Sequence, residues 1–180
     1  MREQLPALIV VVPLAAATIS PLVAYFSKKL VKLLAILSLL VSNISAVAVL
    51  IRVLNDGVWH YHFGGWAPPW GIEYVLDPLS STMAILVSFV ALVVAIYAGP
   101  YLNSYAKMKA GIFYALFLLL SAGLLGMMVT GDVFNLYVFL EIASLAGYAL
   151  IAAGGNRATV AAFRYLLVGT IGASFYLLGV

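Results

Sequence analysis

The chain has 180 residues, of which 66% are hydrophobic and only 8% are charged. Soluble domains contain about 25% charged residues, so this composition excludes an ordinary soluble protein and indicates a membrane protein. Cysteine is absent, which excludes disulfides and cysteine-bound metal centres on this chain, and the net charge of +3 comes from scattered basic residues that form no nucleic-acid-binding face.

Six continuously apolar segments follow one another along the chain, and they predict an all-α integral membrane protein. Their expected bounds are 5–26, 30–54, 79–97, 110–130, 133–153 and 158–180. Strands of a membrane barrel would alternate apolar and polar residues, so these runs favour transmembrane helices. No linker separates soluble domains, and residues 1–180 are therefore expected to form a single membrane domain.

The longest connection, 55–78, lies between the second and third helices and contains all three Trp and both His of the chain. Its stretches VWHYHF and IEYVL flank a turn rich in Gly and Pro, which predicts a small extracytoplasmic β-hairpin. In a strand His60 and His62 point the same way, but two imidazoles without a third ligand make no metal site. We interpret them as interfacial polar residues. Asp77 and Asp132 precede apolar segments and are expected to cap helices.

The basic residues predict which helix ends face the cytoplasm. The first, third and fifth connections and the adjoining helix ends hold Lys28, Lys29, Lys32, Lys107, Lys109, Arg157 and Arg164. The opposite ends hold Arg2 and Arg52. Because cytoplasmic loops are enriched in Lys and Arg, the N-terminus and the hairpin are expected outside the plasma membrane.

The fifth segment, VFNLYVFLEIASLAGYALIAA, has an ionisable residue, Glu141, in its middle. A charged group at that depth costs on the order of 3 kcal/mol, and such residues usually line ion pathways. Helical spacing places Tyr137, Ser144 and Tyr148 on the same face. These hydroxyls can hydrogen-bond the carboxyl or hold water, and the stripe should face a neighbouring helix. A protonated Glu that only holds two helices together is the alternative.

Arg164 is the second charged residue inside an apolar segment. It is expected about 8 Å from the cytoplasmic end of the sixth helix, whereas Glu141 is expected about 20 Å from the corresponding end of the fifth helix. A direct ion pair would therefore need the Arg side chain to reach inward. Snorkelling of Arg164 to the membrane surface is the other interpretation.

Three stretches of the chain resemble a known family of membrane subunits. They are GGWAPPWGIEYVLDPLSSTMAILVSFVALVVAIYA (64–98), GDVFNLYVFLEIASLAGYALIA (131–152) and AAFRYLLVGTIGASFYLLGV (161–180). They are similar to the antiporter-like subunits of Mrp-type sodium/proton antiporters, of respiratory complex I and of archaeal hydrogenases and sulfur reductases. The D-type Mrp subunit is the most similar in its hairpin and fifth-helix motifs.

The resemblance implies that Glu141 matches the family's fifth-helix glutamate, which takes part in proton transfer. Arg164 falls where many members place a Lys, which is a departure because Arg cannot release its proton. Family members have about fourteen helices in two inverted repeats, so this sequence corresponds to the first six. Either another chain supplies the missing helices or the subunit is reduced.

The sequence thus predicts a membrane subunit of a multisubunit complex that translocates protons or sodium ions. Glu141 would form a proton half-channel with Tyr137, Ser144, Tyr148 and Arg164. The alternative is a non-conducting structural or assembly subunit. No catalytic, cofactor or metal motif is found on the chain, so any driving redox chemistry would belong to partner subunits.

Overall fold

The computed structural model describes residues 4–66, 68, 70–102 and 107–180. Arg2 and Glu3, which contribute to the charge pattern near the N-terminus, lie outside the described residues. Most of the described chain is helical, with a small two-stranded sheet between the second and third helices. The described residues contain six α-helices that are long and apolar enough to cross a membrane.

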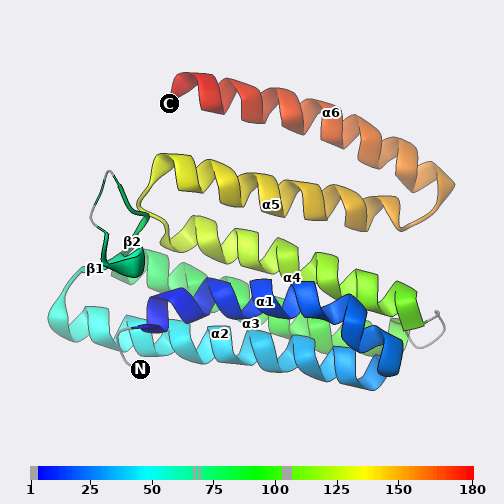
Figure 1. The fold of residues 1–180 in the computed structure, drawn as a ribbon, viewed down its shortest axis with the longest axis horizontal. Helices are drawn as coiled ribbons and strands as arrows, with labels where there is room; N and C mark the ends of the chain where they lie inside the picture. Colours follow the sequence, from blue (N-terminus) through cyan, green and yellow to red (C-terminus); the bar gives the residue numbers. More distant parts are fainter. Residues whose placement is uncertain (1–3, 67, 69, 103–106) are drawn as a thin grey trace.

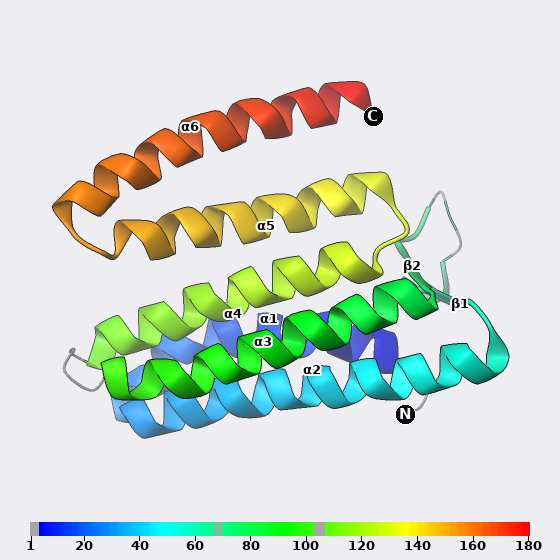
Figure 2. The same cartoon turned by 180° about the vertical axis from the view of Figure 1, so that it is seen from behind.

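The helices run back and forth along one common axis (Figures 1 and 2). Their bounds are α1 Leu5–Phe26, α2 Lys28–Asp56, α3 Pro78–Leu102, α4 Lys107–Val129, α5 Val133–Ala152 and α6 Asn156–Gly179. In the first four helices, α1 packs against α2 and α4, and α3 packs against the same two. Helix α5 then packs on α4, and α6 packs on α5.

Burial falls steeply from the four-helix bundle to α6. Of the most apolar stretch of α4, half of the residues are buried. In the most apolar stretch of α6, 11% are buried. Small residues dominate the buried positions of the bundle, including Ser38, Ser42 and Ser88, whose hydroxyls bond to carbonyls of their own helices. Small side chains allow helix backbones to approach closely in lipid, where apolar burial does not drive association.

Polar side chains cap the helices at the positions that the sequence indicates. The Asp132 carboxylate accepts a hydrogen bond from the backbone N–H of Asn135 at 2.7 Å, at the start of α5. At the start of α3, Asp77 Oδ1 accepts from the N–H of Ser80 at 2.6 Å, and Ser80 Oγ accepts from the N–H of Asp77 at 2.9 Å. The predicted capping by both aspartates is confirmed.

Several helices are longer than their apolar segments predicted. Helix α2 begins at Lys28, α4 begins at Lys107, α6 begins at Asn156, and α3 continues through Gly99 and Pro100 to Leu102. An apolar segment marks the part of a helix that lies in hydrocarbon, whereas the first and last turns extend into the polar interface. A Cβ at Gly99 would overlap only the flexible end of the Lys32 side chain of α2, which can move aside.

The predicted hairpin is present as strands β1 (Trp59–His62) and β2 (Glu73–Leu76), which pair antiparallel with His62 opposite Glu73. A short 3₁₀ turn, Phe63–Gly65, follows β1. The backbone N–H of Gly131 donates to the carbonyl of Glu73 at 3.0 Å, so β2 is joined to the connection that leads into α5. The start of α1 and the end of α6 both lie at the hairpin end of the molecule (Figure 1).

Candidate functional site

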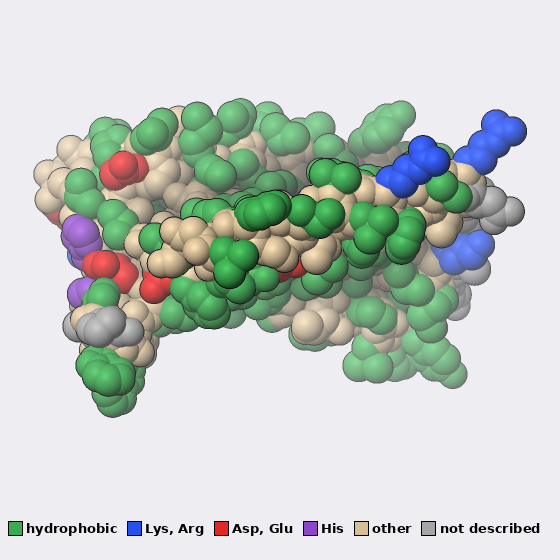
Figure 3. All heavy atoms as spheres, turned by 90° about the horizontal axis from the view of Figure 1, so that it is seen from above, with side chains coloured by type: hydrophobic (Ala, Val, Ile, Leu, Met, Phe, Trp, Pro, Cys, Tyr) green, Lys and Arg blue, Asp and Glu red, His purple; other side chains and the backbone are tan. Residues whose placement is uncertain are grey.

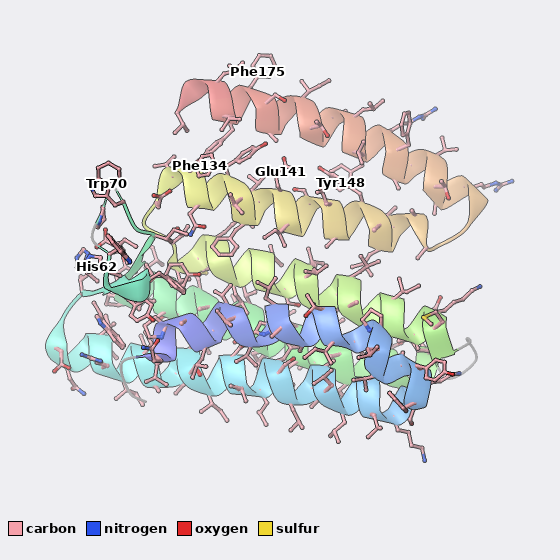
Figure 4. All side chains as sticks on the ribbon, viewed as in Figure 1. His62, Trp70, Phe134, Glu141, Tyr148 and Phe175 are labelled. Atoms are coloured by element: carbon pink, nitrogen blue, oxygen red, sulfur yellow. The ribbon has the colours of Figure 1, made fainter. Side chains whose placement is uncertain are left out.

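Glu141 is the ninth residue of α5, eight residues after Val133. At 1.5 Å per residue, it is about 12 Å from one end of the helix and about 16 Å from the other. Its side chain is half-buried and projects from α5 toward α6 (Figure 4). The carboxyl is therefore near the middle of a span, at the interface between two helices.

Two tyrosines of α5 pack against α6 on either side of Glu141. The Tyr137 ring stacks on Tyr176 with centroids 6.3 Å apart and planes 8° apart, and the Tyr176 hydroxyl donates to the carbonyl of Val133 at 3.1 Å. Toward the other end, Tyr148 is buried and meets the ring of Tyr165 edge-on at 4.8 Å. These contacts fix where α6 lies relative to the carboxyl.

The phenol of Tyr148 lies directly over Gly169 of α6. A Cβ at Gly169 would overlap the phenol oxygen and come within 2.9 Å of Cζ. The absence of a side chain at Gly169 is therefore what allows Tyr148 to point into the α5–α6 interface, as Figure 4 shows. The structure thus brings Tyr137, Glu141 and Tyr148 to the face of α5 that meets α6, with the half-buried Ser144 on the turn between them.

The Glu141 carboxyl makes no hydrogen bond and no ion pair with any other residue that the structure describes. A carboxyl at this depth normally has a partner, because an unpaired polar group in an apolar environment is costly.

The opposite face of α5 packs on α4 through two glycines. A Cβ at Gly123 would lie 2.7 Å from the backbone nitrogen of Ala143, and a Cβ at Gly126 would overlap the Phe139 ring. Gly147 of α5, by contrast, has open space around it. The glycines that matter lie on the partner helix, where the sequence offered no way to pair them with α5.

Arg164 does not lie beside Glu141. On α6 the less exposed positions Ala162, Leu166 and Gly169 form the side that packs on α5. Arg164 is two residues from both Ala162 and Leu166, which is about 200° around the helix, and its side chain is exposed. Arg164 and Glu141 are apart mainly because Arg164 lies on the side of α6 that faces away from α5. The difference in depth that the sequence suggested contributes less.

The hairpin contains a polar cluster that the sequence did not predict. His60 Nδ1 lies 2.7 Å and His62 Nε2 lies 3.2 Å from the same oxygen of Glu73. The strand pairing, which places Glu73 opposite His62, is what brings the three together. Among the described residues, no group of three or more His, Asp or Glu side chains is arranged to hold a metal ion.

The known proteins that this chain resembles agree with one another. The model for the N-terminus of NADH-ubiquinone oxidoreductase (complex I) chain 5 matches residues 60–109. The NADH-quinone oxidoreductase subunit N of Desulforudis audaxviator is 52% identical over 183 aligned residues, which cover 100% of this chain and 36% of that protein.

Two solved structures share the fold. One is the membrane-bound sulfane sulfur reductase, an archaeal respiratory membrane complex, with a TM-score of 0.89, 31% identity, and coverage of 98% of this chain and 36% of that one. The other is the Mrp complex of a Dietzia species, with a TM-score of 0.83, 26% identity, and coverage of 99% and 33%. The resemblance to antiporter-like membrane subunits is confirmed, and the chain spans about a third of the relatives that it matches.

Proposed function

Because this chain is related along its whole length to the N-terminal third of antiporter-like membrane subunits, we propose that it works in a multisubunit complex that moves protons or sodium ions across the plasma membrane. Within that complex Glu141 accepts and releases a proton. Other membrane subunits, among them a chain that supplies further helices, complete the pathway. Redox chemistry, where it drives the transport, belongs to those partners.

The observation that supports this proposal is the position of the Glu141 carboxyl. It lies near the middle of α5, faces α6, and has no hydrogen-bond partner among the described residues. A structural carboxyl would be expected to donate to a neighbouring helix, because that bond is what offsets its burial. A carboxyl that exchanges protons needs access to water instead.

The neighbouring hydroxyls give the proton a route in this proposal. Tyr137 lies one turn before Glu141 on α5, and Ser144 and Tyr148 lie one and two turns after it. Each hydroxyl can accept one hydrogen bond while it donates another, so water molecules held between them can relay a proton along α5. Arg164 contributes a permanent positive charge on the outer side of α6 and exchanges no proton itself.

The charge distribution supports one orientation in the membrane. On the face shown in Figure 3, Lys and Arg gather at one end of the molecule, and Asp, Glu and His gather mainly at the other. Because cytoplasmic ends are enriched in Lys and Arg, we assign the basic end to the cytoplasm and the hairpin to the outside. A proton on Glu141 would then be about midway between the two aqueous phases.

The test is ion-driven pH change in vesicles that contain the purified complex, compared at equal subunit content. Glu141→Gln keeps the size and hydrogen bonding of the side chain but cannot ionise, so it should abolish proton-coupled transport in an assembled complex. Glu141→Asp should retain part of it. Asp56→Asn, which neutralises an exposed acid at the end of α2, is the matched control and should transport like wild type.

The alternative, a structural or assembly subunit, predicts a different outcome. Full transport in an assembled Glu141→Gln complex would limit the carboxyl to a structural role and remove the half-channel from the proposal. Loss of transport accompanied by loss of assembly would have the same consequence, because the carboxyl would then be needed to hold helices together.

A further inference from the structure

A cavity of about 410 Å³ opens at the basic end of the molecule, between the ends of α3, α4 and α5. Its apolar walls come from Leu102 of α3, from Ile112, Phe113 and Leu116 of α4, and from Leu150 of α5. The cavity lies about nine residues along α5 from Glu141, or about 14 Å, and belongs to no part of the proton route proposed above. Helices α4 and α5 diverge toward this end (Figure 2).

Lys109 is the one cation among the described residues that line the cavity, and its side chain is exposed. It is the third residue of α4, so it lies in the first turn, where the helix leaves the hydrocarbon for the headgroup region. From Lys109 to Leu116 the cavity wall extends about 10 Å along α4 into the apolar part of the span. The site therefore combines a positive group at headgroup level with an apolar surface below it.

We propose that this cavity binds an anionic phospholipid. The phosphate would lie against Lys109 and an acyl chain would follow the wall formed by Ile112, Leu116 and Leu150. Basic pockets between transmembrane helices on the cytoplasmic side bind anionic headgroups, because the cytoplasmic leaflet supplies them and the low dielectric strengthens the attraction. The volume lies within the range of sites that hold small organic ligands.

Charge complementarity distinguishes this occupant from a neutral lipid or an apolar helix. Other basic residues at the same end, including Lys29 and Arg157, attract anionic lipid to the surface in general. Among the residues that the structure describes at this end, Lys109 is the one that combines such a charge with the apolar walls of this cavity. Binding there should therefore depend on Lys109 and on open space beside Leu116, whereas Lys29 should not matter.

Native mass spectrometry tests the proposal on the purified complex after exchange into phosphatidylglycerol or phosphatidylcholine. We expect one phosphatidylglycerol to be retained per copy of this chain, and phosphatidylcholine to be lost. Lys109→Ala should weaken retention about five-fold, as expected for one Lys at a membrane surface. Leu116→Trp should fill the cavity and prevent retention, and the control Lys29→Ala should behave like wild type.

Equal retention of the two lipids, or an equal loss in Lys109→Ala and Lys29→Ala, would contradict a site at this cavity. A photo-crosslinking residue at Ile112 in the intact complex adds a second readout. It should label phospholipid. Labelling of a protein chain would show that a partner subunit occupies the cavity, and the lipid proposal would be wrong.

Discussion

Substitution of Gly169 by Ala tests the packing that positions Tyr148 in the α5–α6 interface, on the same face of α5 as Glu141. The added methyl group would overlap the phenol oxygen of Tyr148 and lie 2.9 Å from its Cζ. Neither atom can move away easily, because the Tyr148 ring is buried and meets Tyr165 edge-on. Either the phenol must rotate or α6 must move away from α5.

The expected change in the free energy of unfolding of Gly169→Ala follows from two opposing effects. Overpacking of a well-packed contact destabilises by about 1–3 kcal/mol. Replacing Gly by Ala inside a helix stabilises by about 1 kcal/mol through backbone propensity. Gly172→Ala measures the second effect alone, because nothing lies within 4 Å of a Cβ at Gly172 on the same helix. We therefore expect Gly169→Ala to be about 1–3 kcal/mol less stable than Gly172→Ala.

The measurement is the free energy of unfolding of the full chain in detergent micelles, from reversible denaturation of both variants. A double-mutant cycle identifies the contact, since Tyr148→Phe removes the overlapping oxygen and should recover part of the loss in Gly169→Ala. It should recover nothing in Gly172→Ala. Equal stability of the two Gly variants, or no recovery by Tyr148→Phe, would refute the packing argument.

Three further predictions concern the charged residues and the topology. Because the positive charge of Arg164 acts on whatever covers the outer side of α6, Arg164→Ala should lower ion transport by the assembled complex while Arg164→Lys retains it. Wild-type transport in both variants would leave Arg164 as a residue that only snorkels to the interface. Reporter fusions at Gly65 and Lys107 should lie on opposite sides of the membrane, with Lys107 inside, and a cytoplasmic signal from both would contradict the topology. The hydrogen bond from the backbone N–H of Ser80 lowers the pKa of Asp77. The stability that Asp77 contributes should therefore be present above about pH 4 and lost as the pH falls through that lowered pKa. Asp77→Asn should remove this pH dependence of thermal unfolding.

The spans and the α5 face could be predicted from the sequence because both depend on local patterns. Continuous apolarity gave the six helices and the Gly- and Pro-rich turn gave the hairpin. Helical spacing placed Tyr137 and Tyr148 on the side of Glu141, and in the structure both contact α6. A spacing of three or four residues fixes which side chains share a face, whatever helix covers that face.

The partner of each face could not be predicted in the same way. Gly123 and Gly126 are spaced like many small residues in membrane helices, and nothing local says that they receive Ala143 and Phe139. The cluster of His60, His62 and Glu73 likewise depends on strand register. Contacts between residues far apart in sequence require the relative positions of the elements, which a single sequence does not contain.

Arg164 shows how these two kinds of information differ. The observed bounds of α5 and α6 put Arg164 about 12 Å and Glu141 about 16 Å from the basic end, so their depths are closer than the apolar segments indicated. Depth alone would now favour a pair. Yet the guanidinium lies on the side of α6 opposite to α5, among exposed apolar residues such as Val160 and Ile171. Its charge therefore acts on whatever covers the outer side of α6, and variants of Arg164 probe that surface and not the interface that contains Glu141.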